Sequence, residues 1–137
     1  MTQWREERDH AVAARAAALA RLQEAESALA QELVASFVKE AVAQGLPPTP
    51  LKAYAYTGGA RYRTSVMGWY INADKTIAID VDGNYYGLGV PASFTARFTG
   101  VELKPEQPKL IIGQGGRDGE SMPLKDLLKL RLTRPDL

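Results

Sequence analysis

The first 44 residues of this chain contain neither glycine nor proline, the two residue types that most often interrupt regular structure. Thirteen of the 44 are alanine, and most of the others are leucine, glutamate, glutamine and arginine. These residue types have the highest intrinsic helix propensities. All 12 glycines and all 8 prolines lie from residue 45 onward. The sequence therefore predicts one long helix over about residues 3–44, followed by a turn-rich body.

The expected helix is longer than a compact domain of this size is wide. About 42 residues at about 1.5 Å per residue span roughly 63 Å, whereas a compact chain of 137 residues has a diameter of about 35–40 Å. The helix must therefore protrude, fold back over the sheet, or pack against another chain. We treat residues 1–45 as a possible oligomerisation or docking element and residues 51–137 as the body.

The apolar pattern of the helix separates two parts. Between its start and about residue 30, large apolar side chains fall within one sector about 100° wide, and Arg8, Arg15 and Glu26 interrupt them. From Leu33 onward the apolar face widens, so we expect the last third to be buried against the body. The candidate partner-binding residues of the first part are Trp4, Val12, Leu19, Leu22 and Leu29. Clean heptads are too few to predict a coiled coil from the pattern alone.

The body is predicted to contain short strands and a terminal helix. Strands are predicted over about residues 51–56, 61–71, 76–81, 93–103 and 109–112, and a helix over about 123–133. The predicted fold class is α+β, with a long N-terminal helix, a small antiparallel sheet of about four to six strands and a short C-terminal helix.

One hairpin in the body has a register that can be predicted by counting. A two-residue turn at Gly83-Asn84 would pair Val81 with Tyr86. It would also pair Ile79 with Leu88 and Ile77 with Val90, and all three pairs would lie on one face. The opposite face would then carry Ala78, Gly87 and Gly89, a strip that lets another backbone or a ligand approach closely.

An aromatic and basic cluster suggests a nucleic-acid interface as the alternative function. Rings beside arginines on a sheet can stack on single-stranded bases and hold the phosphates. The candidate residues are Tyr54, Tyr56, Arg61, Tyr62 and Arg63. A formal net charge of +1 supplies no general attraction to nucleic acid.

The sequence argues against the common catalytic and metal-binding arrangements. There is no cysteine, and His10 is the only histidine and lies in the helix. The Gly113–Gly119 loop has Asp118 where a dinucleotide fingerprint needs its third glycine, although Gly115, Gly116 and Arg117 are candidates for binding a small anion or nucleotide. The sequence predicts no catalytic residue, no metal site and no cofactor.

These observations favour a non-enzymatic, cytoplasmic interaction protein that acts through its N-terminal helix. The expected partner is the chain itself, as a homo-oligomer, or another protein. The start of the chain lacks a signal-peptide layout and no apolar stretch is long enough to cross a bilayer, so no membrane partner is expected. The alternative to an interaction role is that the helix folds back as a lid over its own sheet.

Overall fold

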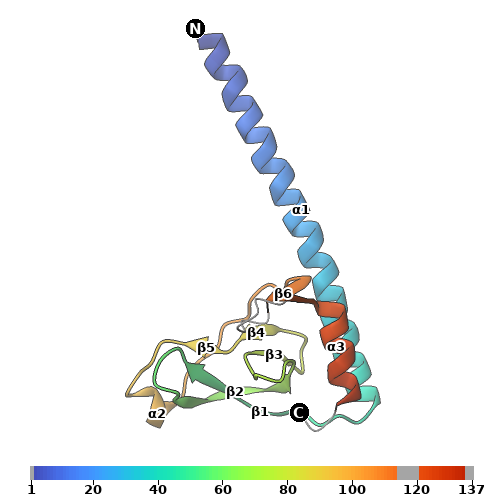
Figure 1. Ribbon diagram of the computed structural model, residues 1–137, viewed down its shortest axis with the longest axis vertical. Coiled ribbons are helices and arrows are strands. Elements are labelled where there is room, and N and C mark those ends of the chain that lie inside the picture. The colour runs from blue at the N-terminus through green and yellow to red at the C-terminus, as the bar shows by residue number, and fades with distance from the viewer. Residues whose placement is uncertain (1, 114–120, 135–137) are drawn as a thin grey trace.

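A computed structural model describes residues 2–113 and 121–134 of the chain. It has a long helix, a curled five-stranded sheet, a two-stranded sheet and two further helices (Figure 1). The elements are α1 (Thr2–Ala43), β1 (Thr49–Ala55), β2 (Arg61–Tyr70), β3 (Ile77–Asp80), β4 (Tyr85–Gly87), β5 (Gly89–Val90), α2 (Ala96–Thr99), β6 (Ile111–Gly113), β7 (Ser121–Pro123) and α3 (Leu124–Thr133). The predicted α+β fold class is confirmed.

Helix α1 is continuous over 42 residues and ends where glycine and proline first appear. Gly45 has a φ of 72°, a left-handed conformation that glycine adopts without strain. The Leu46 amide donates to the Ala41 carbonyl at 2.9 Å, and the Gly45 amide donates to the Val42 carbonyl at 3.0 Å. These bonds satisfy carbonyls that the helix end leaves open, and Pro47 and Pro48 then start the extended connection to β1.

The larger sheet has the order β4-β3-β2-β1-β5. The pairs β1–β2, β2–β3 and β3–β4 are antiparallel, as predicted, whereas β1 and β5 are parallel. Only Leu88 separates β4 from β5 along the chain, although the two strands lie at opposite edges of the sheet order. The sheet must therefore curl until its edges approach each other, and the Tyr54 amide donates to the Leu88 carbonyl at this junction.

The main core lies between the sheet and the last part of α1. Phe37 and Trp69 meet edge to face with their ring centroids 5.8 Å apart, and both are buried. The Trp69 indole also donates to the Leu46 carbonyl at 3.1 Å. Helix α3 lies beside the same part of α1 (Figure 1) and adds Leu124, Leu127 and Leu128 to this core. The expected burial of the last third of the long helix is confirmed.

The predicted register of the β3–β4 hairpin is wrong. Ile79 pairs with Tyr85 and Ile77 pairs with Gly87, around a turn at residues 81–83. The turn is longer because the Asp80 carboxylate accepts hydrogen bonds from the Asp82 amide at 2.9 Å and from the Asn84 amide at 2.8 Å. An aspartate that binds amides two and four residues ahead holds the backbone in a local turn before the ladder can start.

The prediction of one strand over residues 93–103 is also wrong, because this segment contains the short helix α2. The Ala96 amide donates to the Ser93 hydroxyl at 3.3 Å at the start of the helix. At its end, Gly100 has a φ of 77° and its amide donates to the Ala96 carbonyl. A hydroxyl before the turn and a glycine after it are local helix signals, and they outweigh the apolar alternation.

Candidate interaction surfaces

The large apolar side chains in the first part of α1 form an exposed stripe. Its members are Trp4, Val12, Leu19, Leu22 and Leu29, and 54–68 % of each residue is exposed. The part of α1 that carries most of this stripe extends away from the body (Figure 1), and each residue on it up to position 26 is exposed. Within the chain, α1 therefore protrudes from the body and does not fold back over the sheet.

The exposed stripe is not a simple extension of the helix face that packs on the sheet. At 100° per residue, the stripe is centred roughly 70° away from the face formed by the buried residues Ala30, Val34 and Ala41. The rotation is toward the side of α1 that faces α3. The stripe therefore leads along α1 to the junction between these two helices.

A mainly apolar groove lies at that junction. It has a volume of about 220 Å³ and is lined by α1 on one side and α3 on the other. The residues of this α1/α3 groove are Leu33, Ser36, Phe37, Glu40, Lys125, Leu128, Lys129 and Leu132. Ser36 and Glu40 lie on the same side of α1 as Leu22 and Leu29. The exposed stripe and the α1/α3 groove thus form one continuous surface.

The residues predicted to bind nucleic acid are divided between the two faces of the sheet. Tyr54 pairs with Arg61 across the β1–β2 ladder, and Ala53 pairs with Tyr62. Neighbouring positions of a strand point to opposite faces, so Arg61 and Arg63 share the face of Tyr54, whereas Tyr62 lies on the other. Tyr62 is buried and its hydroxyl accepts the Ser93 amide, which makes it a core residue.

The sheet face that carries Tyr54, Arg61 and Arg63 is partly covered by tyrosine rings. The rings of Tyr54 and Tyr56 meet edge to face with centroids 6.4 Å apart, and a Cβ atom added to Gly89 would lie 2.5 Å from the Tyr56 ring and 2.9 Å from the Tyr54 hydroxyl. The predicted bare glycine strip is therefore covered near Gly89 by these tyrosines. Arg63 donates to the Phe98 carbonyl at 3.1 Å, which ties its guanidinium to the body.

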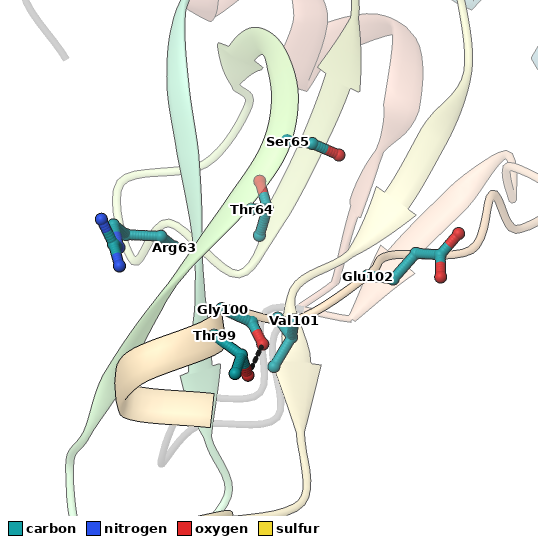
Figure 2. A pocket seen from close by; sticks show the side chains of 7 residues that line it. All are labelled: Arg63, Thr64, Ser65, Thr99, Gly100, Val101 and Glu102. Atoms are coloured by element: carbon teal, nitrogen blue, oxygen red, sulfur yellow. Dashed lines mark hydrogen bonds between the residues drawn. The ribbon is translucent and has the colours of Figure 1, made fainter. Parts of the chain in front are cut away.

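A wide hollow lies beside β2 and the segment after α2. It has a volume of about 690 Å³ and is lined by residues 63–65 and 99–102. Arg63 and Glu102 lie on opposite sides of it and point away from each other, and the Thr99 hydroxyl donates to the Gly100 carbonyl (Figure 2). The side chains of this hollow do not converge on a common point, which a reaction centre requires.

Asp80 is a buried polar residue of the body whose carboxylate accepts several hydrogen bonds. Burial alone would raise its pKa, but hydrogen bonds from Asn84, Tyr86 and the Asp82 amide outweigh this and hold the pKa below its ordinary value. In turn, burial and the Asp80 carboxylate raise the pKa of Tyr86 to about 12. Burial together with the Glu106 carboxylate raises the pKa of Tyr85 to about 12. The partners of Asp80 are all within its own hairpin, so this network stabilises the turn.

A second exposed apolar patch was not expected from the sequence. Phe94 and Phe98 are 76 % and 69 % exposed, and their rings meet edge to face with centroids 5.8 Å apart. Phe98 lies in α2 and Phe94 in the turn that leads into it, and this single helical turn brings the two rings together. The signal that could have identified the pair is the spacing of Ser93 and Gly100, which delimits the helical turn.

Two searches for other kinds of site were negative within the described ranges. Residues 2–113 and 121–134 hold no group of three or more histidine, cysteine, aspartate or glutamate side chains that could bind a metal ion. None of the described helices has a stretch long and apolar enough to cross a membrane. The candidate anion-binding residues Gly115, Gly116 and Arg117 lie outside the described residues.

Comparison with known proteins adds no relative from which a function could be carried over. No protein-family model matches the chain, and neither a curated protein nor a solved structure matches it. Any functional conclusion must therefore rest on the chain's own surfaces.

Proposed function

We propose that this chain is a non-enzymatic interaction protein that associates with itself through the N-terminal part of α1. The observation that carries the proposal is the exposed stripe, whose five large apolar residues are each 54–68 % exposed. Docking of a different protein on the same stripe is the alternative. We also propose a cytoplasmic location, which a chain without cysteine fits.

The physical argument is that the body offers this stripe no cover. Large apolar side chains in one line on a helix gain free energy when another apolar surface removes them from water. Scattered single apolar residues need no explanation, but a contiguous patch marks an interaction site. A second helix is the natural cover, because residues three and four positions apart present a narrow surface that a facing helix fills.

The test compares the solution mass of the wild-type chain with that of two triple variants. The stripe variant carries Leu19→Gln, Leu22→Gln and Leu29→Gln. Glutamine and leucine have similar helix propensities, so the helix itself should be retained. We expect the wild type to have the mass of an oligomer in light scattering at about 100 µM, and the stripe variant to have the mass of a monomer.

The matched control places three glutamines on the opposite side of the same helix, at Ala17, Glu24 and Ala28. It should have the same mass as the wild type and the same helical circular dichroism signal as the stripe variant. Equal masses of wild type and stripe variant at every concentration would contradict the proposal.

Binding of single-stranded nucleic acid is the second candidate function, supported by one observation. Tyr54 pairs with Arg61, and Lys52 pairs with Arg63, so one tyrosine and three basic side chains lie on one face. The test is fluorescence anisotropy of a labelled oligothymidine at low salt, with wild type and an Arg61→Glu, Arg63→Glu variant. Binding that weakens with salt and in the variant supports this candidate, and no binding by the wild type rejects it.

A further inference from the structure

We infer that the exposed stripe pairs with the exposed stripe of a second copy in an antiparallel arrangement, and that the α1/α3 groove receives the partner's Trp4. This inference rests on the proposed self-association and adds its geometry. It assigns a binding site to a groove that the sequence did not reveal. Three features of the described residues support it: the order of charges in the stripe, the small residues beside it, and the position of the groove.

The first feature is the order of apolar and charged residues along the stripe, which follows a heptad spacing within α1. Positions 12, 19, 26 and 33 alternate with positions 15, 22 and 29 at intervals of three and four residues. In an antiparallel pair of helices, each position of the first set faces a position of the second set in the partner. When Leu19 faces the partner's Leu22, Val12 faces the partner's Leu29 by the same count. All four large apolar positions of this stretch are then paired.

The same register places two of the three interrupting charges, Arg15 and Glu26, opposite each other, while the third, Arg8, lies level with the partner's Leu33 near the end of the interface. Arg15 faces the partner's Glu26, and symmetry repeats the pair at the other end. A parallel pair in register would instead bring Arg15 against the partner's Arg15, and Glu26 against the partner's Glu26. Like charges opposite each other in an apolar interface cost free energy. Moving the antiparallel pair by one heptad removes this pairing, because Arg15 then faces the partner's Leu19 or Glu26 faces the partner's Leu22, close to the centre of the interface.

The second feature is the set of residues that flank these positions. Alanine stands on both sides of the stripe, and each of these alanines is exposed: Ala11, Ala16, Ala18 and Ala25. In coiled coils the flanking positions usually carry charges that choose the orientation. Between residues 11 and 25 they carry none, so two helices can approach closely there, and the choice between parallel and antiparallel falls to Arg15 and Glu26.

The third feature is the position of the groove along the helix. In the proposed register the partner's Trp4 lies level with Phe37, which lines the α1/α3 groove. Trp4 is 63 % exposed, with the Arg8 guanidinium 5.4 Å from its ring as the described contact. A helical side chain leans toward the start of its own helix, which directs this indole toward Glu40 and the far end of the groove. The two bodies then lie at opposite ends of the helix pair.

Disulfide formation between single-cysteine variants tests this arrangement, since the chain has no cysteine of its own. Val12→Cys and Leu29→Cys are prepared separately, mixed in equal amounts and oxidised. We expect a linked dimer that contains one copy of each variant. Neither variant should link to itself, because the two copies of position 12 lie about 25 Å apart in the antiparallel pair, and a disulfide requires Cα atoms within about 7 Å.

A second pair tests the groove. Arg5→Cys mixed with Ser36→Cys should also give the mixed dimer, since Ser36 lines the α1/α3 groove and faces position 5 of the partner in this register. Failure of this pair while the first pair links would overturn the assignment of the groove.

The remaining outcomes separate this inference from the proposed function. Linkage of Val12→Cys to itself, with no mixed product, indicates parallel helices; it overturns the antiparallel inference and leaves self-association through the stripe in place. A wild-type chain that stays monomeric at about 100 µM overturns both.

Discussion

Replacing Leu22 by alanine should separate association from folding more sharply than any other single change in this chain. Leu22 is 68 % exposed, the largest value among the stripe residues. Its side chain is thus largely free of the body, whereas in the proposed dimer it lies next to the symmetry axis against the partner's Leu19. The substitution should weaken the dimer and leave the monomer intact.

The size of the effect follows from this exposure. Full burial of a leucine side chain stabilises by about 1.5–3 kcal/mol, so burial of the exposed part contributes about 1–2 kcal/mol in each copy. The twofold axis repeats the contact, and alanine retains about a third of it. The expected loss is about 1.3–2.7 kcal/mol per dimer, which is a dissociation constant about 10- to 100-fold higher. The monomer should change by less than about 0.5 kcal/mol, since alanine is the better helix former.

Two measurements check this prediction. Sedimentation equilibrium over a range of concentrations gives the dissociation constant, and urea unfolding at a concentration where the chain is monomeric gives the free energy of unfolding. Glu24→Ala is the control, since it shortens an exposed side chain on the opposite side of α1. The reasoning is refuted if Leu22→Ala leaves the dissociation constant within about twofold of the control, or if it destabilises the monomer by more than about 1 kcal/mol.

Three further predictions concern the charges of the stripe, the sheet and the hairpin. Arg15→Glu or Glu26→Arg alone should raise the dissociation constant of the dimer about tenfold or more in sedimentation equilibrium, and the double variant should restore it. A double variant that dimerises more weakly than either single variant contradicts the pairing. Gly68→Ala should lower the free energy of unfolding by about 2–4 kcal/mol in urea titrations, because its Cβ would overlap with the Ile79 carbonyl oxygen in the next strand. In the control Gly87→Ala, the Cβ would meet only the flexible carboxylate of Glu106, at 3.1 Å. Similar losses in the two variants contradict this reasoning. The lowered pKa of Asp80 means that the folded state binds a proton at this carboxylate less readily than the unfolded state does. The carboxylate therefore stabilises the fold above about pH 4, and this contribution is lost as the pH falls through the lowered pKa. Asp80→Asn should flatten the fall of the free energy of unfolding below about pH 4, and an unchanged acid profile contradicts the assignment.

The long helix and its end could be predicted because the signals are local. Helix propensity and the exclusion of glycine and proline act within a few residues, and Gly45 and Leu46 form the cap that their sequence indicates. The division of the helix near Leu33 was also predictable, since it depends only on which residues share a side. How the free part is placed was not predictable, because the same stripe fits a lid, a protrusion and an interface.

The hairpin and the α2 segment show where alternation is a weak guide. In both, apolar residues at every second position predicted a longer ladder, and in both a side-chain oxygen bound nearby amides first. The Asp80 carboxylate lengthens the turn of the hairpin, and the Ser93 hydroxyl starts the helical turn of α2. Such bonds form between residues two to four apart, so they compete with strand pairing before the sheet imposes a register.

The parallel pairing of β1 and β5 and the α1/α3 groove have no local signal at all. Leu88 lies between two short strands, and nothing in its neighbours indicates that Val90 pairs with Ala55. The pairing follows from the curl of the whole sheet, which brings its two edges together. The groove likewise needs α3 to return beside α1 after the entire body has folded. Features that depend on closure of the fold are the ones that the sequence alone does not reveal.

The residues that look like defects in the helix pattern carry the most information about its partner. A stripe of leucine and valine alone would bind another stripe in several registers and both orientations, because apolar contact is nonspecific in direction. Arg15 and Glu26 cost stability in any apolar interface unless they meet, and among the arrangements compared above they meet only in the proposed antiparallel register. The two charges that set the orientation lie before Ala30, whereas the core of the body uses α1 from Ala30 onward. Folding and partner selection therefore depend on different residues of one helix, so each can be altered without losing the other.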